Sequence, residues 1–253
     1  MLKAIMTRFR QGHRTFKYPD APLPLPPRFR GLPVLDPSRC TDECRACAAA
    51  CPYGAVSPDG PLTLDMGKCL FCGDCAAACP GDALTFSTDA RLSSRSRSGL
   101  TVTAGERYYP ADGLEGELLR LFGRSLKLRE VSAGGCNACE ADTNVLSTIG
   151  WDLGRFGIQF VASPRHADGL FVTGPVSENM RLALLDTYAA IPEPKLVVVA
   201  GACAINGGPF KDHAEVHNGA DGLLPVDLYI PGCPPSPLTI LDGLLRLVGR
   251  ITE

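Results

Sequence analysis

Cysteine is the residue of this chain whose spacing most clearly points to chemistry. Eight of the twelve cysteines fall between Cys40 and Pro80, in two runs that each end in Cys-Pro. The second run has the spacing C-x2-C-x2-C-x3-C-P, which is typical of segments that hold a pair of [4Fe–4S] clusters. The sequence therefore predicts iron–sulfur ligation here, with one-electron transfer as its chemistry.

In such a pair the last cysteine of each run leaves on a helix and ligates the other cluster. We therefore expect two sets of four thiols. The first set is Cys40, Cys44, Cys47 and Cys79, and the second set is Cys69, Cys72, Cys75 and Cys51. The first run departs from the pattern, since three residues rather than two separate Cys40 from Cys44.

Two other uses of many cysteines are the alternatives. Four-cysteine zinc sites also contain C-x2-C pairs, and secreted disulfide scaffolds are rich in cysteine. Neither needs two interleaved runs with trailing prolines. Met1–Phe9 is too short and too charged for a signal peptide, so we expect metal ligation in a reducing compartment.

The other four cysteines lie far apart in the sequence but in similar places. Each follows an apolar, strand-like run, and glycine or proline flanks it. Ligands of open α/β sheets bind outside the carboxyl ends of the strands, so these thiols are expected to share one rim and hold a third [4Fe–4S] cluster. Four separate buried cysteines are the alternative. This third set is Cys136, Cys139, Cys203 and Cys233.

The elements that position the third set alternate along the chain. Residues 126–132 are strand-like, and the apolar runs that follow are 158–163, 169–174, 195–201 and 226–232; helical patterns at 114–125, 137–150, 177–191 and 237–250 separate or flank them. Apolar strands alternating with helices predict a parallel sheet covered on both faces.

Four regions are expected along the chain. Residues 1–37 form an extended docking arm, with a short amphipathic helix over 2–10 and a strap with seven prolines over 18–37. The helix fits a partner protein or a membrane surface, and the strap is expected to cross a neighbouring subunit. The other regions are the two-cluster domain (38–88), a linker (89–113) and the α/β domain (114–253).

Charge and hydropathy limit the kinds of partner that the chain is expected to bind. The net charge of −2 gives no general affinity for nucleic acid, and Arg91, Arg95 and Arg97 are expected in a solvated linker or a partner contact. No apolar run approaches the roughly 20 residues that span a bilayer. We therefore expect a chain without a membrane span, cytoplasmic and held on the inner face of the cytoplasmic membrane by partner subunits.

Two resemblances give these features a family context. Residues 30–90 resemble the two-cluster ferredoxins, particularly the ferredoxin-like subunits of respiratory complex I and of membrane-bound [NiFe]-hydrogenases. Residues 114–250 resemble the small subunit of [NiFe]-hydrogenases and its 20 kDa homologue in complex I, through C-N-A-C-E, T-G-P-V-S and D-L-Y-I-P-G-C-P-P. The resemblance to complex I is weaker at Cys136 and Cys139, which are adjacent cysteines in most complex I subunits.

The resemblance implies a fold and a function. The fold is an α+β ferredoxin-like two-cluster domain followed by an α/β flavodoxin-like domain. The function is electron transfer, through three [4Fe–4S] clusters, to or from the catalytic large subunit of an energy-converting [NiFe]-hydrogenase of the formate-hydrogenlyase type. Peripheral and membrane subunits are the further partners. The alternatives are a complex I-like quinone oxidoreductase subunit and a free-standing polyferredoxin carrier.

The sequence leaves the roles of three polar residues open. Glu140, directly after Cys139, is a candidate for a proton path or for a salt bridge to a partner. His213 and His217 have the i, i+4 spacing of a metal pair, but a solvated loop is favoured. No catalytic residue is expected on this chain, and no G-x-G-x-x-G or Walker loop points to nucleotide binding.

Overall fold

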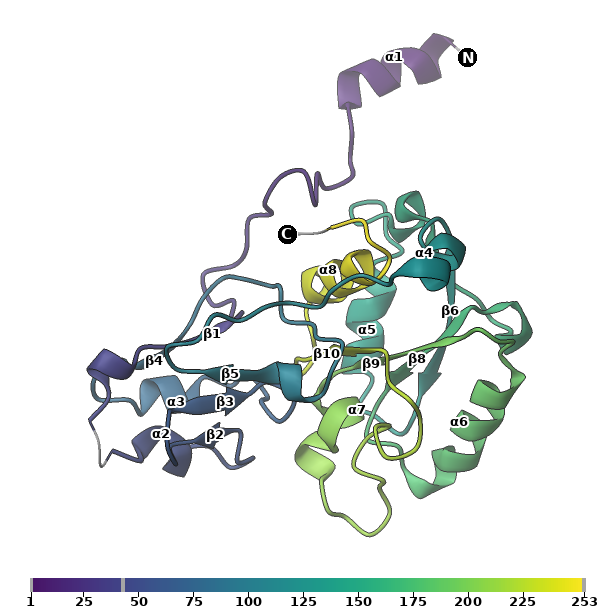
Figure 1. Ribbon diagram of the computed structural model, residues 1–253. Coiled ribbons are helices and arrows are strands. Elements are labelled where there is room, and N and C mark those ends of the chain that lie inside the picture. Colours follow the sequence, from purple (N-terminus) through teal and green to yellow (C-terminus); the bar gives the residue numbers. More distant parts are fainter. Residues whose placement is uncertain (1, 42–43, 252–253) are drawn as a thin grey trace.

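The computed structural model describes residues 2–41 and 44–251. Helix α1 (Leu2–Gln11) stands away from the body on an extended segment, as Figure 1 shows. It confirms the amphipathic helix predicted over 2–10. Its apolar residues are all exposed, namely Leu2, Ile5, Met6 and Phe9.

A small module of short strands and one-turn helices follows the arm. It contains a two-stranded antiparallel sheet, β1 with β4, and a three-stranded antiparallel sheet in the order β2-β3-β5. Its elements are β1 (Pro33–Leu35), η1 (Pro37–Arg39), α2 (Ala46–Ala49), β2 (Val56–Ser57), β3 (Thr63–Asp65), α3 (Asp74–Ala77), β4 (Leu84–Phe86), η2 (Ser98–Leu100) and β5 (Thr101–Thr103).

The rest of the chain is built on a five-stranded parallel sheet in the order β10-β9-β8-β6-β7, which confirms the predicted parallel sheet. The strands are β6 (Leu126–Ser132), β7 (Ile158–Phe160), β8 (Gly169–Thr173), β9 (Leu196–Ala200) and β10 (Leu228–Ile230). The helices are α4 (Gly116–Phe122), α5 (Ala138–Val145), α6 (Glu178–Ala190), α7 (Ala202–Asn206) and α8 (Pro237–Leu247), with 3-10 turns η3 (Leu153–Phe156), η4 (Pro164–His166) and η5 (Gly208–Phe210).

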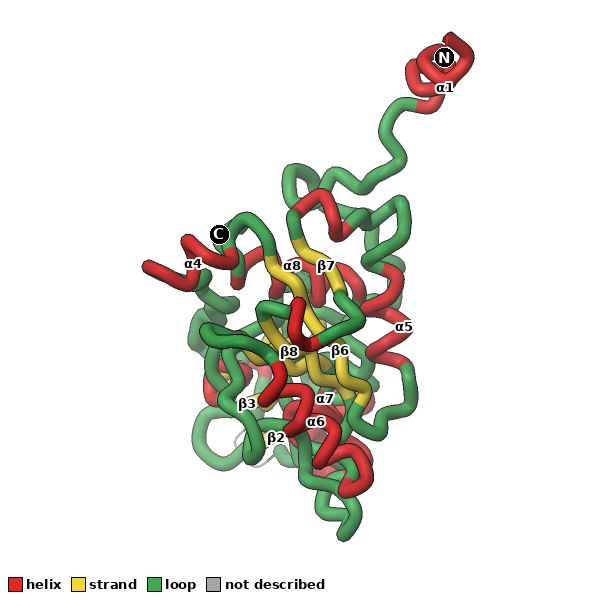
Figure 2. Tube along the Cα trace, turned by 90° about the vertical axis from the view of Figure 1, so that its right-hand side faces the viewer, coloured by secondary structure: helices red, strands yellow, loops and turns green. Residues whose placement is uncertain are grey.

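Helices cover both faces of this sheet. Figure 1 shows α5 and α8 above the strands and α6 and α7 below them, and Figure 2 shows the sheet from the side. Every residue of β8 and β9 is buried, because side chains alternate between the two covered faces. In β8, for example, Phe171 packs on the α8 side and Val172 on the other.

The small module and the sheet domain share one hydrophobic core. Leu64, Met66 and Leu100 of the module belong to the same buried cluster as Val172 and Val197 of the sheet. Burial of apolar surface between them holds the two parts together. The two cysteine-rich regions are therefore packed against each other in one body.

The segment 89–113 differs from the predicted solvated linker. Leu92, Ser93 and Ser94 are buried, and Ser94 forms an antiparallel bridge with Tyr229 at the edge of the parallel sheet. The segment also supplies β5 to the small module. The prediction of a solvated segment was wrong because serine-rich, weakly periodic sequence looks solvated, whereas here the backbone of Ser94 bonds to that of Tyr229 and Arg95 Nε donates to the carbonyl of Asp227.

The arm makes contacts within the chain at its inner end, just before the strap. Phe16 packs edge-on against Trp151, with ring centroids 5.0 Å apart. Its N–H donates to the carbonyl of Gly150 at 2.7 Å. Arg155 Nη2 donates to the carbonyls of Phe16 and Tyr18. Intramolecular contacts thus hold the beginning of the strap.

Candidate functional site

Four of the twelve cysteines occupy the same local position. Each is the second residue of a helix, which places its sulfur beside backbone N–H groups that have no partner within the helix. Such groups favour the thiolate that binds iron. The four are Cys47 in α2, Cys75 in α3, Cys139 in α5 and Cys203 in α7.

The structure brings three members of the predicted first set together. Burial raises the pKa of the Cys47 thiol, and the nearby thiolates of Cys79 and Cys40 raise it further. Cys79 therefore lies with the first run, although the second run carries it in the sequence. Cys44 adjoins residues 42–43, which lie outside the described residues, and no described contact joins it to the other three.

In the predicted second set Cys69 and Cys75 are buried, Cys51 is half-buried and Cys72 is exposed. Burial raises the pKa of Cys69 to about 12, with further contributions from Cys75, Cys51 and Cys72. Burial likewise raises the pKa of Cys75 to about 11, and Cys51 and Cys72 act on it too. Cys51 therefore lies with the second run. A bound metal ion would offset the free-energy cost of ionising these buried thiols, because it takes the place of the thiol proton.

Cys51 and Cys79, the last cysteines of the two runs, accept matching hydrogen bonds from the backbone. The N–H of Ala55 points to the sulfur of Cys51 at 3.4 Å, and the N–H of Ala83 points to the sulfur of Cys79 at 3.2 Å. In both cases the donor lies four residues after the cysteine and just past its proline. Hydrogen bonds to sulfur of this kind tune the reduction potential of iron–sulfur centres.

The third set gathers at one rim of the parallel sheet. Cys136 follows β6, Cys203 follows β9 and Cys233 follows β10, as expected for the carboxyl ends of parallel strands. Burial raises the pKa of Cys139, and Cys203, Cys233 and Cys136 all act on it. Burial also raises the pKa of Cys203 to about 12. The structure therefore brings all four thiols together.

Glycines make room around the third set. A Cβ on Gly201 would lie 2.5 Å from the sulfur of Cys139, and one on Gly208 would lie 2.8 Å from the sulfur of Cys203. Both glycines have positive φ, which other residues adopt only with strain. Four convergent thiols within such a cradle fit a [4Fe–4S] group, which is held by four cysteine thiolates.

Glu140 points inward rather than to a partner. It is 6% exposed, and its Oε1 accepts hydrogen bonds from Ser132 at 2.5 Å and Thr173 at 2.6 Å. Burial acts to raise its pKa, but these hydrogen bonds outweigh burial and lower the pKa. The predicted salt bridge to a partner is therefore wrong, while a role in a proton path stays a prediction.

A second carboxyl lies near Glu140 and was not singled out from the sequence. Burial raises the pKa of Glu130, on β6, to about 7, and the charge of Glu140 contributes to this rise. Its Oε1 is buried without a hydrogen-bond partner among the described residues. Its strand also carries Lys127 and Arg129, so no signal in the local sequence indicated this burial.

The histidine pair does not form a metal site. His217 Nε2 lies 2.5 Å from Glu178 Oε2, whereas His213 Nδ1 accepts from the N–H of Glu215. Across residues 2–41 and 44–251, no group of three or more His, Cys, Asp or Glu side chains is arranged around a single metal ion.

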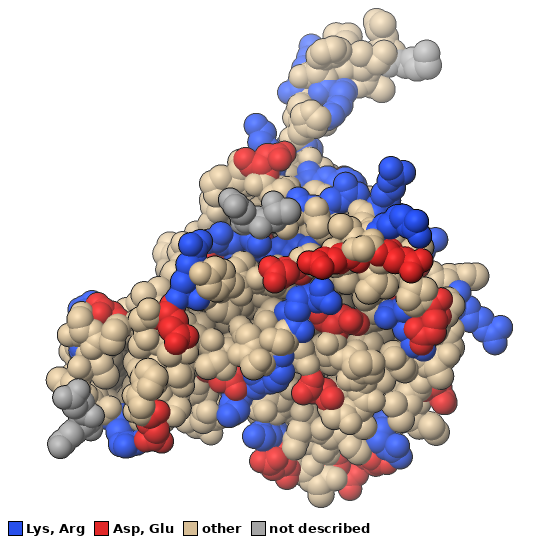
Figure 3. Space-filling view, in the orientation of Figure 1, with Lys and Arg blue, Asp and Glu red and all other residues tan. Residues whose placement is uncertain are grey.

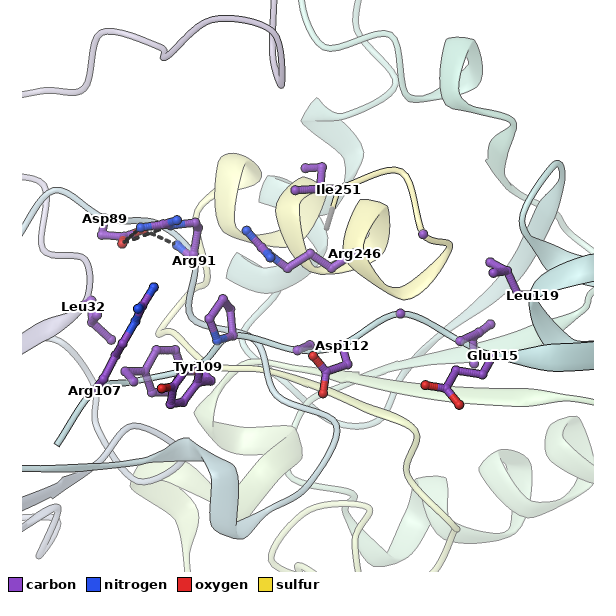
Figure 4. A pocket seen from close by; sticks show the side chains of 16 residues that line it. Leu32, Asp89, Arg91, Arg107, Tyr109, Asp112, Glu115, Leu119, Arg246 and Ile251 are labelled. Carbon is purple, nitrogen blue, oxygen red and sulfur yellow. Dashed lines mark hydrogen bonds and ion pairs between the residues drawn. The ribbon is translucent and has the colours of Figure 1, made fainter. Parts of the chain in front are cut away.

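A cavity of about 910 Å³ lies away from the cysteines, none of which lines it. Figure 4 shows the Arg246 side chain extending from α8 toward Arg91 and Asp89, which line the same cavity. Arg246 is 3% exposed, and its Nε donates to Asp242 at 2.9 Å. Asp242 also accepts from the Tyr18 hydroxyl at 2.6 Å. This network holds the strap on α8.

Comparison with known proteins places both parts of the chain in described families. Residues 136–247 match the family described as NADH ubiquinone oxidoreductase, 20 Kd subunit. Residues 39–83 match the 4Fe-4S dicluster domain. The second match covers both cysteine runs, and the first covers the whole third set.

Three similar proteins show the range of these relatives. Formate hydrogenlyase subunit 7 of Escherichia coli is 41% identical over 140 residues, which cover 55% of each protein. The probable membrane-bound hydrogenase subunit mbhJ of Pyrococcus furiosus is 36% identical over 54% of this chain and 82% of its own length. An NADH-quinone oxidoreductase subunit of Clostridium beijerinckii is 44% identical over 46% of this chain and 70% of its own length.

Proposed function

Because the chain belongs to the family of the NADH ubiquinone oxidoreductase 20 Kd subunit, we propose that it is an iron–sulfur electron-transfer subunit of a membrane-associated, energy-converting [NiFe]-hydrogenase. The catalytic [NiFe] centre then lies on a large-subunit partner. Relatives named as hydrogenase and formate hydrogenlyase subunits support this assignment. So does the two-residue gap between Cys136 and Cys139, the form typical of hydrogenases.

Three [4Fe–4S] clusters are the proposed cofactors, and such groups supply one-electron chemistry when bound. Their proposed ligands are the three sets: Cys40, Cys44, Cys47 and Cys79; Cys69, Cys72, Cys75 and Cys51; and Cys136, Cys139, Cys203 and Cys233. The observation that carries the proposal is the convergence of the third set from three strand ends. The protein positions the thiolates and provides N–H groups and burial that set their electron affinity.

The proposed fold labels are ferredoxin-like for the small module and flavodoxin-like for the sheet domain. Counted in chain order within its domain, the parallel sheet has the strand order 2-1-3-4-5, which is the flavodoxin-like order. The proposed division is an arm (1–37), a two-cluster domain (38–88), a connecting segment (89–113) and the α/β domain (114–253).

The third set is the proposed exit toward the large subunit. Cys136 and Cys233 are exposed, while Cys203 is buried behind them. A partner placed on this rim would cover the two exposed thiols and bring its own centre close to them. The second set, which packs toward the sheet domain, would then connect the first set to the third.

The proposed association with the membrane is peripheral and runs through partner subunits. Within the part of the chain that the structure describes, no helix is both long and apolar enough to cross a bilayer. Helix α1 carries basic side chains without acidic ones, as Figure 3 shows for the visible face. Its exposed apolar face would be covered in the complex, by a partner near the membrane or by the membrane surface.

A subunit of a complex I-like quinone oxidoreductase is the second candidate. The specific observation in its favour is the 44% identity to an NADH-quinone oxidoreductase subunit. In that assignment the same three sets would serve the same electron path. The difference lies in the partner, which would offer a quinone site in place of nickel.

Purification of the native complex from its source tests the assignment. The hydrogenase proposal predicts nickel in the complex, hydrogen evolution with a strong one-electron donor, and three paramagnetic centres on this chain in the reduced state. Quinone reduction without nickel would favour the complex I-like candidate. Fewer than three centres would overturn the three-cluster proposal under either assignment.

A further inference from the structure

The loop before Cys69 touches the helix that carries Cys203. Gly67 lies two residues before Cys69, and Ile205 lies two residues after Cys203. A Cβ on Gly67 would come within 2.9 Å of the Ile205 Cγ2 atom, so the two elements are in close contact at this point. This contact joins the element that carries the second set to one that carries the third.

The Arg97 guanidinium lies at the same contact. A Cβ on Gly67 would meet Arg97 Cζ and Nη1 at 2.7 Å. Arg97 Nη1 and Nη2 donate to the two oxygens of Asp65, each at 2.8 Å. This bidentate pair is mostly shielded from water, since the side chains are 26% and 18% exposed. A shielded, bidentate pair holds its geometry better than an exposed one.

Asp65 is in turn tied to the loop of the second set. Its carbonyl accepts from the N–H of Cys69 at 3.1 Å, and its Oδ1 accepts from the N–H of Gly67 at 2.9 Å. Lys68 Nζ lies 3.8 Å from its Oδ2. The carboxylate therefore fixes the turn that ends at the first cysteine of the second run.

The backbone that carries Arg97 is fixed to the sheet domain. Ser94 and Tyr229 exchange two backbone hydrogen bonds of 3.0 and 2.8 Å, and Arg95 Nε donates to the carbonyl of Asp227 at 3.0 Å. Arg97 thus reaches from a segment held on β10 to a carboxylate of the small module. Its charge lies where an electron would pass between the second and third sets.

We propose that Arg97 is a positioning residue for electron transfer between the second and third sets, and that its charge raises the electron affinity of the centre ligated by Cys69. With the groups bound, one electron would pass between the group held by the second set and the group held by the third, in either direction, and no bond would form or break. The proposal rests on the proposed function. An added electron makes the centre more negative, so a nearby cation favours the reduced state and a nearby anion disfavours it.

The direction of the shift in midpoint potential distinguishes an effect of the Arg97 charge from a purely structural role of this residue. R97Q removes one positive charge and leaves the Asp65 carboxylate with only the more distant Lys68 as a counter-ion, so the midpoint potential of the second-set centre should fall. D65N leaves Arg97 as an unbalanced cation, so the same potential should rise. The expected change is about tenfold in the equilibrium constant for reduction, or about 59 mV for one electron. The double variant R97Q/D65N should return close to the parent, and R97K should keep most of the effect.

The measurement is a redox titration of the holoprotein, followed by low-temperature paramagnetic resonance. The matched control R91Q breaks another bidentate arginine–aspartate pair on the same segment, in which Arg91 Nε and Nη2 donate to the two oxygens of Asp89, and should leave the potential unchanged. Shifts in the same direction for R97Q and D65N, or no shift in either, would overturn the proposal. If R97Q does not fold, the direction of the shift in D65N, compared with R97K, which keeps the positive charge, still tests the predicted sign of the potential change.

Failure of this proposal is separable from failure of the proposed function. If the parent protein shows fewer than three centres, the three-cluster assignment itself falls. If three centres are present and the two charge variants do not shift the second-set potential in opposite directions, only the role of Arg97 falls.

Discussion

The sulfur of Cys139 lies beside the place where a side chain on Gly201 would begin, since a Cβ there would be 2.5 Å from it. Cys139 is the second residue of α5 and Gly201 directly follows β9, more than sixty residues further along the chain. Heavy atoms cannot approach that closely without displacement, so only glycine fits. The third set therefore depends on a residue that has no ligand atom of its own.

Gly201→Ala should remove the centre of the third set and spare the other two. The new methyl would displace the Cys139 thiol, and φ of +93° adds strain. Paramagnetic resonance and iron analysis of the holoprotein measure the result, which should be a loss of about a third of the bound iron. Gly105→Ala is the matched control, because Gly105 has φ of +82° and nothing within 4 Å of its Cβ position. Equal losses in both variants would point to backbone strain rather than to the cradle.

Exchange of the last cysteines between the two runs gives a second prediction. Cys51→Ser should perturb the same resonance as Cys75→Ser, whereas Cys79→Ser should perturb the same resonance as Cys47→Ser. The reason is that Cys51 acts on the thiols of the second set and Cys79 on those of the first. Paramagnetic resonance spectra of the four variants, each compared with the spectrum of the parent protein, check this prediction. Grouping of Cys51 with Cys47 instead would contradict the assigned pairing.

Glu130 should make stability depend on pH. Burial raises its pKa to about 7 from an ordinary value of 4.5, so between these values the folded state holds a proton that the unfolded state has released. The stabilising contribution of the neutral carboxyl is present below about pH 4.5 and is lost as the pH rises through 7. Its size is on the order of 1–2 kcal/mol, because solvent reaches the half-buried group.

Denaturant unfolding of the holoprotein at about pH 5.5 and about pH 8 measures this dependence. Glu130→Gln should flatten the difference between the two conditions and unfold at higher denaturant than the parent at the upper pH. An unchanged pH difference in the variant would show that another group titrates in this range.

The strap should contribute to stability through Tyr18. Tyr18→Phe removes the hydrogen bond to the buried Asp242, and the expected loss is about 1.5–3 kcal/mol in the free energy of unfolding, as for bonds to charged groups. Tyr109→Phe is the control, because that side chain is 70% exposed and should change stability by less than about 0.5 kcal/mol. Thermal or denaturant unfolding compares the two, and equal effects would argue against a structural strap.

The local chemistry could be predicted from the sequence because its determinants lie within a few residues of each other. The two- and three-residue gaps between cysteines specify a ligand loop, and the apolar runs specify buried parallel strands with loops at their carboxyl ends. From those patterns the members of the third set could be predicted without the structure. In the structure Cys136, Cys203 and Cys233 follow the carboxyl ends of β6, β9 and β10, and their assignment with Cys139 as the ligands of one cluster stays a prediction.

Only the tertiary structure decided how the two cysteine-rich parts meet. Residues 89–113 look like a solvated linker, yet Ser94 bonds to Tyr229 and Arg97 to Asp65. The contact of Gly67 with Ile205 and the burial of Glu130 likewise left no mark in the local pattern. Such contacts depend on which complete surfaces pack together, and residues more than a hundred positions apart become neighbours only after the core they share has formed.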